Sequence, residues 1–185
     1  MPSGERCDSI EAMTPDQNPV CDVDEFRATM ASVCMPVTVV TAMDAGRPHG
    51  TTVSAFSSLS IEPPLVMVAL DRGSDLLAII VATKRFGVNL LAHGQEDLAL
   101  KFARKGSDKF DNVAWLESHG LPRLDMNGGW VVCELDDLRE GGDHMILLGR
   151  VLKVEPVAGA PLVYHNRLFG THSEYVTIDA PEVSL

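Results

Sequence analysis

The hydrophobic pattern of the first half of the domain changes from a helical period to a strand-like one. Phe26, Met30, Val33 and Cys34 recur at helical spacing, and Asp22 followed by Glu25 is typical of a capping box. We therefore expect an amphipathic helix that ends before Pro36. The β-branched run 37–41 predicts a strand, and a turn is expected over 45–48. Further strands are expected over 50–60 and, after the break at Pro63-Pro64, over 65–70.

The second half alternates between short helices and strands. Ser74 is a candidate N-cap for a helix whose apolar face holds Leu77, Ile80 and Val81. A half-buried strand is expected over 86–90, and a third helix over 95–104 stops near Gly106. A loop over 120–122 precedes strands at 130–135 and 144–154, which Gly141-Gly142 joins into a hairpin. Many strands with three short helices predict a closed antiparallel barrel with helices on its outside, and not a βαβ sheet.

Composition divides the chain into an acidic tail and one domain. The 185 residues fit a single domain. Residues 1–21 contain few large apolar side chains, so we expect a disordered N-terminal tail and a folded domain over 22–185. Of the net charge of −11, residues 1–25 carry −6, because they hold seven acidic residues and one arginine. Such a balance repels phosphate, which disfavours binding to nucleic acid.

The same composition bears on location and on metal binding. The apolar runs 65–70 and 76–82 are too short to cross a bilayer, and residues 1–20 lack the apolar stretch of a secretory signal. We therefore expect a soluble cytoplasmic protein with no membrane partner. The four cysteines show no C-x-x-C spacing, which favours reduced thiols over a disulfide framework or a zinc site. No metal is expected.

Three features carry candidate chemistry. Residues 50–60 place small hydroxyl side chains among glycine and alanine, so that a flat ligand can lie against the backbone; a plain Ser/Thr-rich edge strand is the alternative. A basic cluster in residues 84–109 is a candidate phosphate site, against the alternative of a solvated helix face. Its members are Lys84, Arg85, Lys101, Arg104, Lys105 and Lys109. His144 begins a strand beside Asp143, where an imidazole can bind a carboxamide or phosphate and the acid can fix its tautomer, although histidines in turns are common.

Motifs of other enzyme classes are absent. The chain contains no G-x-G-x-x-G after a strand, no Walker A loop, no H-E-x-x-H and no G-x-S-x-G. Rossmann dinucleotide binding, P-loop phosphoryl transfer, zincin chemistry and α/β-hydrolase chemistry are therefore disfavoured.

Six separated motifs, in order over residues 26–169, resemble the short-chain flavin reductases that serve two-component flavin-dependent monooxygenases. They are the run 37–41, the segment 50–60 with 63–66, the segment 86–91, Phe102-Ala103 with Lys109-Phe110, Gly142-Asp143-His144, and the run 161–164. The resemblance implies a mainly β fold, an antiparallel Greek-key split β-barrel with flanking short α-helices. It also implies an NADH-dependent oxidoreductase that reduces FAD or FMN and releases the reduced flavin to a partner monooxygenase.

The resemblance also implies site residues. The flavin ring and ribityl chain would lie along Thr51, Thr52, Val53, Ser54, Ala55 and Ser58. Its phosphate side would meet Asp71, Ser74, Asn89 and Leu90, and Lys109 and Phe110 would lie near the flavin tail. The nicotinamide nucleotide would meet Pro36, His144 and Phe169. Members of this family are usually homodimers with sites near the subunit interface, which predicts a homodimer here.

Two positions depart from the family pattern. Met35-Pro36 stands where many relatives have glycine, and Phe169 stands where a tyrosine is frequent. Two other functions stay open: a non-enzymatic flavin carrier or sensor on the same barrel, and a heme- or pyridoxamine-type oxidase on a similar barrel. Because flavin and nicotinamide carry the hydride chemistry, we expect no residue to be essential for proton transfer, and His144 to be a positioning group.

Overall fold

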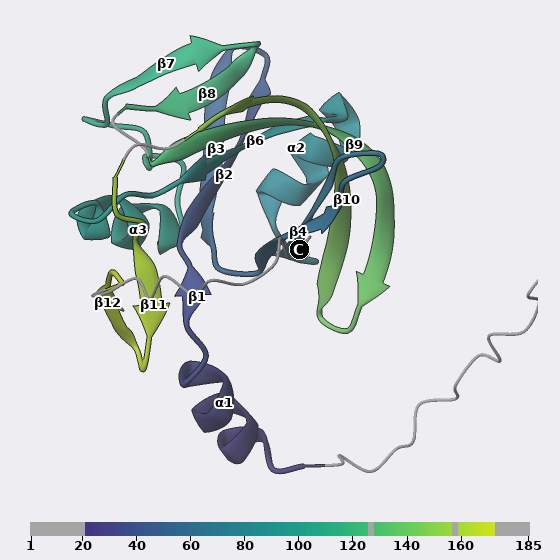
Figure 1. The fold of residues 1–185 in the computed structure, drawn as a ribbon. Coiled ribbons are helices and arrows are strands. Elements are labelled where there is room, and N and C mark those ends of the chain that lie inside the picture. The colour runs from purple at the N-terminus through teal and green to yellow at the C-terminus, as the bar shows by residue number, and fades with distance from the viewer. Residues whose placement is uncertain (1–20, 126–127, 157–158, 173–185) are drawn as a thin grey trace, which may run out of the picture.

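The computed structural model describes residues 21–125, 128–156 and 159–172. Of the predicted tail over 1–21, only Cys21 lies within these residues. Figure 1 shows a strongly curved sheet with the short helix α2 (Asp75–Thr83) in its concavity. None of the helices in the described part of the chain combines the length and the hydropathy that crossing a bilayer requires.

Seven antiparallel strands form the main sheet. Their order is β3 (Arg47–Val53), β2 (Thr38–Asp44), β6 (Arg85–Leu90), β9 (Gly129–Gly141), β10 (His144–Glu155), β5 (Leu65–Asp71) and β4 (Phe56–Ser60). This confirms the mainly β, antiparallel fold with short helices. The predicted strand over 50–60 is two strands, because the chain leaves β3 after Val53 and begins β4 at Phe56.

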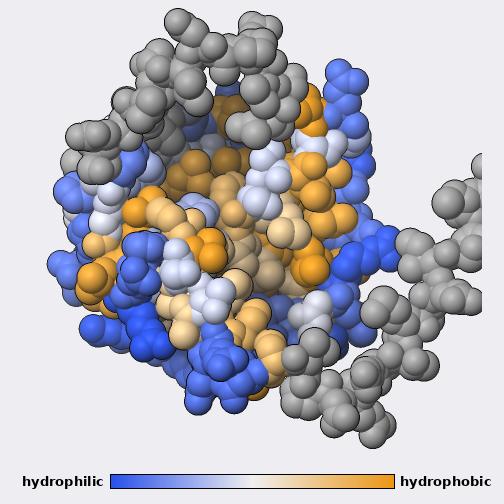
Figure 2. Space-filling model, turned by 60° about the horizontal axis from the view of Figure 1, so that its bottom comes forward, coloured by the Kyte–Doolittle hydropathy of each residue, from blue (hydrophilic) through white to orange (hydrophobic). Residues whose placement is uncertain are grey.

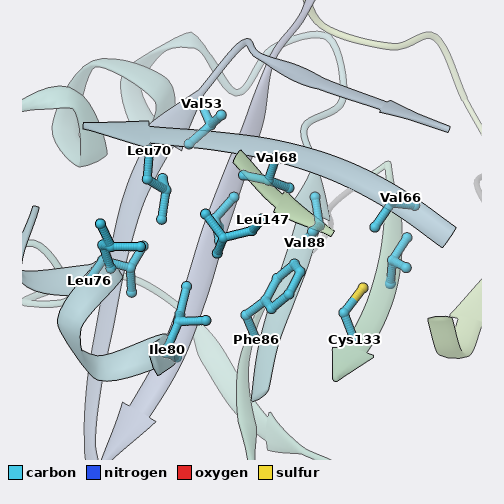
Figure 3. Packing of buried hydrophobic residues seen from close by; sticks show 14 residues of the cluster. Val53, Val66, Val68, Leu70, Leu76, Ile80, Phe86, Val88, Cys133 and Leu147 are labelled. Carbon is cyan, nitrogen blue, oxygen red and sulfur yellow. The ribbon is translucent and has the colours of Figure 1, made fainter. Parts of the chain in front are cut away.

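The core fills the space between this sheet and α2. Leu76, Leu77 and Ile80 of α2 are buried against the strands. Figure 3 shows Ile80 next to Phe86 of β6 and Leu147 of β10, with Leu76 on the side of Leu70 in the same cluster. Burial of such a contiguous apolar cluster supplies most of the driving force for folding. These buried contacts hold α2 against the concave face of the sheet.

Strand β6 differs from the sequence expectation. An alternating half-buried strand was expected, but residues 86–89 are all buried. A Cβ at Gly87 would lie 1.9 Å from Cη2 of Trp130, so the indole covers the face expected to meet solvent. Asn89 is buried as well. Its Nδ2 donates a hydrogen bond to Val39 O, and its Oδ1 accepts one from the backbone amide of Leu124.

Five short strands were not foreseen. β7 (Trp115–Ser118) and β8 (Leu121–Leu124) form a hairpin where a loop was expected over 120–122, and its turn residues His119 and Gly120 both have positive φ. β1 (Met35–Pro36), β11 (Val163–His165) and β12 (Leu168–Gly170) form a separate three-stranded sheet. We refer to this sheet together with α1 (Val23–Ala31) as the arm.

The three predicted helices are present. Asp22 caps α1 by accepting hydrogen bonds from the amides of Asp24 and Glu25. The helix ends at Ala31, and none of its residues is buried, although its sequence is amphipathic. α3 (Glu96–Ala103) packs Ala99 and Phe102 inward near β3. The predicted hairpin at Gly141-Gly142 is confirmed, with Gly141 paired to His144.

Candidate functional site

A pocket lies beside the break between β3 and β4, where β3 and β5 from the two ends of the curved sheet come together. A cavity of about 240 Å³ lies between the end of β3, the end of β5, the start of α2 and the first residue of β10. Its walls are formed by Thr51, Thr52, Val53, Ser54, Ala55, Ala69, Leu70, Asp71, Ser74 and His144. Eight of these ten residues belong to the predicted site. Ala69 and Leu70 were not foreseen, because an apolar run in a buried strand carries no signal of a ligand.

Strand β3 offers its backbone to this pocket. β3 is the last strand of the seven-stranded sheet and pairs with β2 on one side alone. An edge strand directs a row of N–H and C=O groups away from its partner, where they can bind a ligand. The small residues Ser54 and Ala55 follow, and Ala55 O accepts the amide of Ala69 at 3.0 Å. A flat ring can therefore approach this backbone closely.

The hydroxyl groups of β3 have a second role. Thr52 Oγ1 donates to Ala99 O at 2.7 Å, and Thr51 Oγ1 to Phe102 O at 3.4 Å. Both hydroxyl protons are used to hold β3 against α3. The oxygen lone pairs and the strand backbone remain for a ligand.

Lys109 borders the pocket without lining it. Its Nζ donates to Gly50 O at 3.1 Å and to Phe102 O at 3.0 Å. Burial lowers the pKa of the Lys109 ammonium from its ordinary value, and the negative charge of Asp75 opposes this shift. The ammonium thus lies close to Gly50, which precedes Thr51, and near Asp75, which follows Ser74.

The loop between β5 and α2 forms another wall. The carboxylate of Asp71 accepts the amide of Gly73 at 2.7 Å, and Asp71 O accepts the amide of Ser74 at 3.0 Å. Ser74 occupies the N-cap position of α2 but makes no side-chain capping bond. Its hydroxyl lines the pocket at the positive end of a nine-residue helix, where an anionic group is favoured.

His144 closes the pocket from the β9–β10 turn. Its side chain is 43% exposed, and its Nδ1 lies 2.8 Å from the Asp143 carboxylate. The hydrogen bond from His144 lowers the pKa of Asp143, and the charges of His144 and Arg72 act in the same direction. The imidazole is therefore held by a partner that stays ionised, and the rest of the ring faces the pocket.

Other predicted site residues lie elsewhere. Ser58 is exposed on β4, Asn89 and Leu90 belong to β6, and Phe110 stacks edge-on against Phe102 and Trp115. Pro36 is in β1 of the arm, and Phe169 packs against Tyr164 at 5.1 Å. Phe169 also lines a second hollow of about 350 Å³ together with Cys34 and His165.

The six basic residues do not form one cluster. Lys84 caps the C-terminal end of α2, whereas Lys109 faces Asp75 at the opposite end of that helix. Arg85 pairs in register with Glu134 on β9. Lys101 donates to Asp111 O and braces the loop after α3. Lys109 is a member of the predicted phosphate site that the structure brings near the pocket.

The pocket can take a flat polar ring with an anionic tail. The edge backbone and the small residues of β3 suit a heteroaromatic ring, and the start of α2 with Lys109 suits phosphate. His144 lines the pocket beside the end of β5, where it can contact a bound ring. No three His, Cys, Asp or Glu side chains in the described ranges come together as metal ligands.

Comparison with known proteins identifies the family. Residues 30–173 match the flavin reductase like domain. The chain is 36% identical over 154 residues to the reductase component of the 4-nitrophenol 4-monooxygenase/4-nitrocatechol 2-monooxygenase of Rhodococcus opacus, covering 83% of each chain. It is 37% identical over 149 residues to a flavin reductase of Pseudomonas putida, covering 78% of this chain and 88% of that one.

Solved structures agree with this match. The NADH:FAD oxidoreductase SgcE6 of Streptomyces globisporus, in complex with NAD and FAD fragments, superposes with a TM-score of 0.76 at 30% identity. The superposition covers 86% of this chain and 96% of that one. The nitrilotriacetate monooxygenase component B of Mycobacterium thermoresistibile gives a TM-score of 0.79 at 28% identity, over 88% and 96% of the two chains. The chain belongs to the flavin reductase like domain family.

Proposed function

We propose that this protein is the reductase component of a two-component flavin-dependent monooxygenase. It oxidises NADH, reduces FAD or FMN, and releases the reduced flavin to its partner monooxygenase. The observation that carries this proposal is the pocket in which the β3 edge, the start of α2 and His144 meet. The chemistry is a hydride transfer from C4 of the nicotinamide to N5 of the flavin, and the protein contributes binding and alignment.

Each wall of the pocket has a role in this proposal. The backbone of 51–55 holds the flavin ring, and Asp71, Ser74 and Lys109 border its phosphate side. His144 binds the nicotinamide nucleotide. Pro36 and Phe169 complete the nicotinamide site from the arm. In Figure 1 the arm and the β9–β10 turn lie on two sides of the same lower end of the molecule.

We further propose a homodimer that covers this end. Val23, Phe26 and Met30 of α1 are 54%, 54% and 46% exposed, which is unusual for an amphipathic helix. Figure 2 shows this end of the molecule with apolar surface around a central hollow and polar residues at its rim. A second copy would cover this surface and place the two sites near the interface.

We also propose a cytoplasmic location, where the free thiols of Cys21, Cys34 and Cys133 stay reduced.

The first experiment follows NADH oxidation by absorbance, without flavin and with added FAD or FMN. We expect oxidation that depends on free flavin and saturates with its concentration. The flavin that gives the higher kcat/KM is then the preferred substrate. Flavin binding without NADH oxidation would instead favour the carrier or sensor on this barrel, and a heme or pyridoxamine absorbance in the purified protein would favour an oxidase.

A second experiment tests His144. Loss of one hydrogen bond to the nicotinamide in His144→Ala should raise the KM for NADH roughly three- to tenfold. Flavin binding, measured by fluorescence quenching, should change little. His93→Ala is the matched control, because His93 is exposed and does not line the pocket. Unchanged NADH kinetics in His144→Ala would remove the nicotinamide role from this residue.

A further inference from the structure

The loop after β5 and the turn that carries His144 are joined through one arginine. The amide of Arg72 donates to Asp143 O at 3.1 Å, and its Nε donates to Gly142 O at 2.7 Å. A third contact runs from its guanidinium to Glu140 at 3.5 Å. Arg72 therefore holds both residues of the two-residue turn and the end of β9.

This arginine lies between two walls of the pocket. Asp71, the residue before Arg72, pairs in register with His144. Ser74 follows Arg72 by two residues. Gly142 has a φ of +68°, and apart from its two chain neighbours no residue has a heavy atom within 4 Å of the place where its Cβ would be. Side-chain packing does not fix the turn at this residue. The position of the turn depends on the pairing of β10 with β5 and β9 and on the hydrogen bonds from Arg72.

The carboxylate of Asp143 decides which nitrogen of His144 carries a hydrogen. An ionised carboxylate can only accept hydrogen bonds, so the contact of 2.8 Å requires a hydrogen on Nδ1. In the neutral ring, Nε2 is then left as an acceptor. The N–H group of the nicotinamide carboxamide is the complementary donor.

We propose that Arg72 and Asp143 are positioning residues for His144. Arg72 holds the Gly142-Asp143 turn against the β5–α2 loop, and Asp143 fixes the Nδ1–H tautomer. Together they present Nε2 of His144 as the acceptor for the carboxamide N–H of NADH. This inference rests on the proposed nicotinamide role of His144 and assigns its substrate contact to one ring atom and one functional group.

The kinetic test uses single and double variants. Arg72→Met and Asp143→Asn should each raise the KM for NADH about three- to tenfold, as expected for one weakened hydrogen bond, and leave the KM for flavin nearly unchanged. Because both residues act through His144, neither substitution should raise the KM further in a His144→Ala background. Arg150→Met is the matched control: this exposed arginine of β10 makes an ion pair with Asp136 of β9, away from the turn that joins these two strands.

The outcomes separate this inference from the proposed function. If His144→Ala leaves the KM for NADH unchanged, the nicotinamide role itself fails. If His144→Ala raises this KM but Arg72→Met and Asp143→Asn do not, the positioning role alone is overturned. Additive effects in the double variants would overturn it as well, since the residues would then act independently of His144. Thermal unfolding of each variant identifies any change in KM that comes from a misfolded protein.

A spectroscopic test does not depend on turnover. Long-range ¹H–¹⁵N correlation spectra of the full-length protein report which imidazole nitrogen carries the hydrogen, and His144→Ala assigns the signal. We expect the Nδ1–H form for the neutral ring in the wild type, and a shift toward the Nε2–H form in Asp143→Asn, whose amide can donate to Nδ1. The same tautomer in both proteins would overturn the role of Asp143.

A substrate analogue tests the carboxamide. In reduced 3-acetylpyridine adenine dinucleotide a methyl ketone replaces the carboxamide, so the N–H donor is lost while the ring and nucleotide remain. The wild type should prefer NADH over this analogue by a larger kcat/KM ratio than His144→Ala does. An equal ratio in the two proteins would show that Nε2 does not accept from the carboxamide.

Discussion

Cys133 and Cys34 show how surroundings set the reactivity of a single residue. Cys133 is fully buried beside Phe86 and Gly149 in the main core, and burial raises its pKa to about 12. Cys34 is exposed and lines the second hollow. Because the thiolate is the nucleophile, we expect iodoacetamide at about pH 8 to modify Cys34 in the folded protein and to modify Cys133 only after unfolding. Peptide mass mapping measures both, and equal rates of labelling would contradict the buried environment of Cys133.

The same thiol predicts a pH dependence of stability. In the unfolded chain a cysteine ionises near its ordinary pKa of 9.0, whereas folded Cys133 keeps its proton up to about pH 12. The folded state therefore binds more protons between these values. The contribution of Cys133 is complete below pH 9 and is lost as the pH rises to 12, by at most about 1.4 kcal/mol per pH unit. Urea unfolding at a series of pH values should show a steeper alkaline loss in the wild type than in Cys133→Ala.

Among the elements, those with a strong local pattern could be predicted from the sequence. β2 and β5 are runs of β-branched and apolar residues, and Asp22 is an N-cap residue that marks the start of α1. The arm strands are two or three residues long and exist through pairing between distant segments, for which a local pattern carries no signal. In β6, the indole of Trp130 and the partners of Asn89 come from other strands, so its burial on both faces could not be seen locally.

Some residues of the candidate site could likewise be predicted from the sequence, and others depend on the fold. The segment 51–55 and the Gly142-Asp143-His144 turn could be found in the sequence because they are continuous motifs with unusual composition. Ala69, Leu70 and the bracing role of Arg72 depend on the pairing of β5 with β10, which only the fold provides.

The β7–β8 hairpin is attached to the sheet by buried hydrogen bonds. Thr41 Oγ1 donates to Pro122 O at 2.7 Å, and Asn89 links Val39, Thr41 and Leu124. Thr41→Val keeps the shape of the side chain but leaves the Pro122 carbonyl without its donor, so we expect it to lower the free energy of unfolding by about 1–3 kcal/mol. Urea unfolding measures this value. Thr83→Val, at an exposed helix end, should change it by less than about 0.5 kcal/mol.

At the scale of the whole molecule, the arm is where we propose that a second copy of the chain binds. The seven-stranded sheet and α2 share one contiguous core, whereas α1 buries none of its residues in its own chain. Stable interfaces cover roughly 600–1,000 Å² on each partner, and exposed apolar surface gathered at one end is the usual sign of such contact. The arm also carries Pro36 and Phe169, so the proposed dimer and the proposed nicotinamide site depend on the same surface.

This dependence predicts a joint loss of dimer and NADH affinity. The combined substitution Phe26→Glu and Met30→Glu places two charges on the exposed apolar face of α1 without touching the pocket around His144. We expect sedimentation to show the wild type at twice the chain mass of 20.0 kDa and the variant near the single mass. The KM for NADH should rise in the variant, because the arm contacts are lost while the flavin walls stay in place. Leu116→Glu is the matched control, since Leu116 is 48% exposed and belongs to β7, which lies at the opposite end of the molecule from α1 in Figure 1. A monomeric wild type, or dissociation by Leu116→Glu as well, would count against an interface formed by α1. A monomeric variant with an unchanged KM for NADH would separate the two roles, and would place the whole nicotinamide site within one chain.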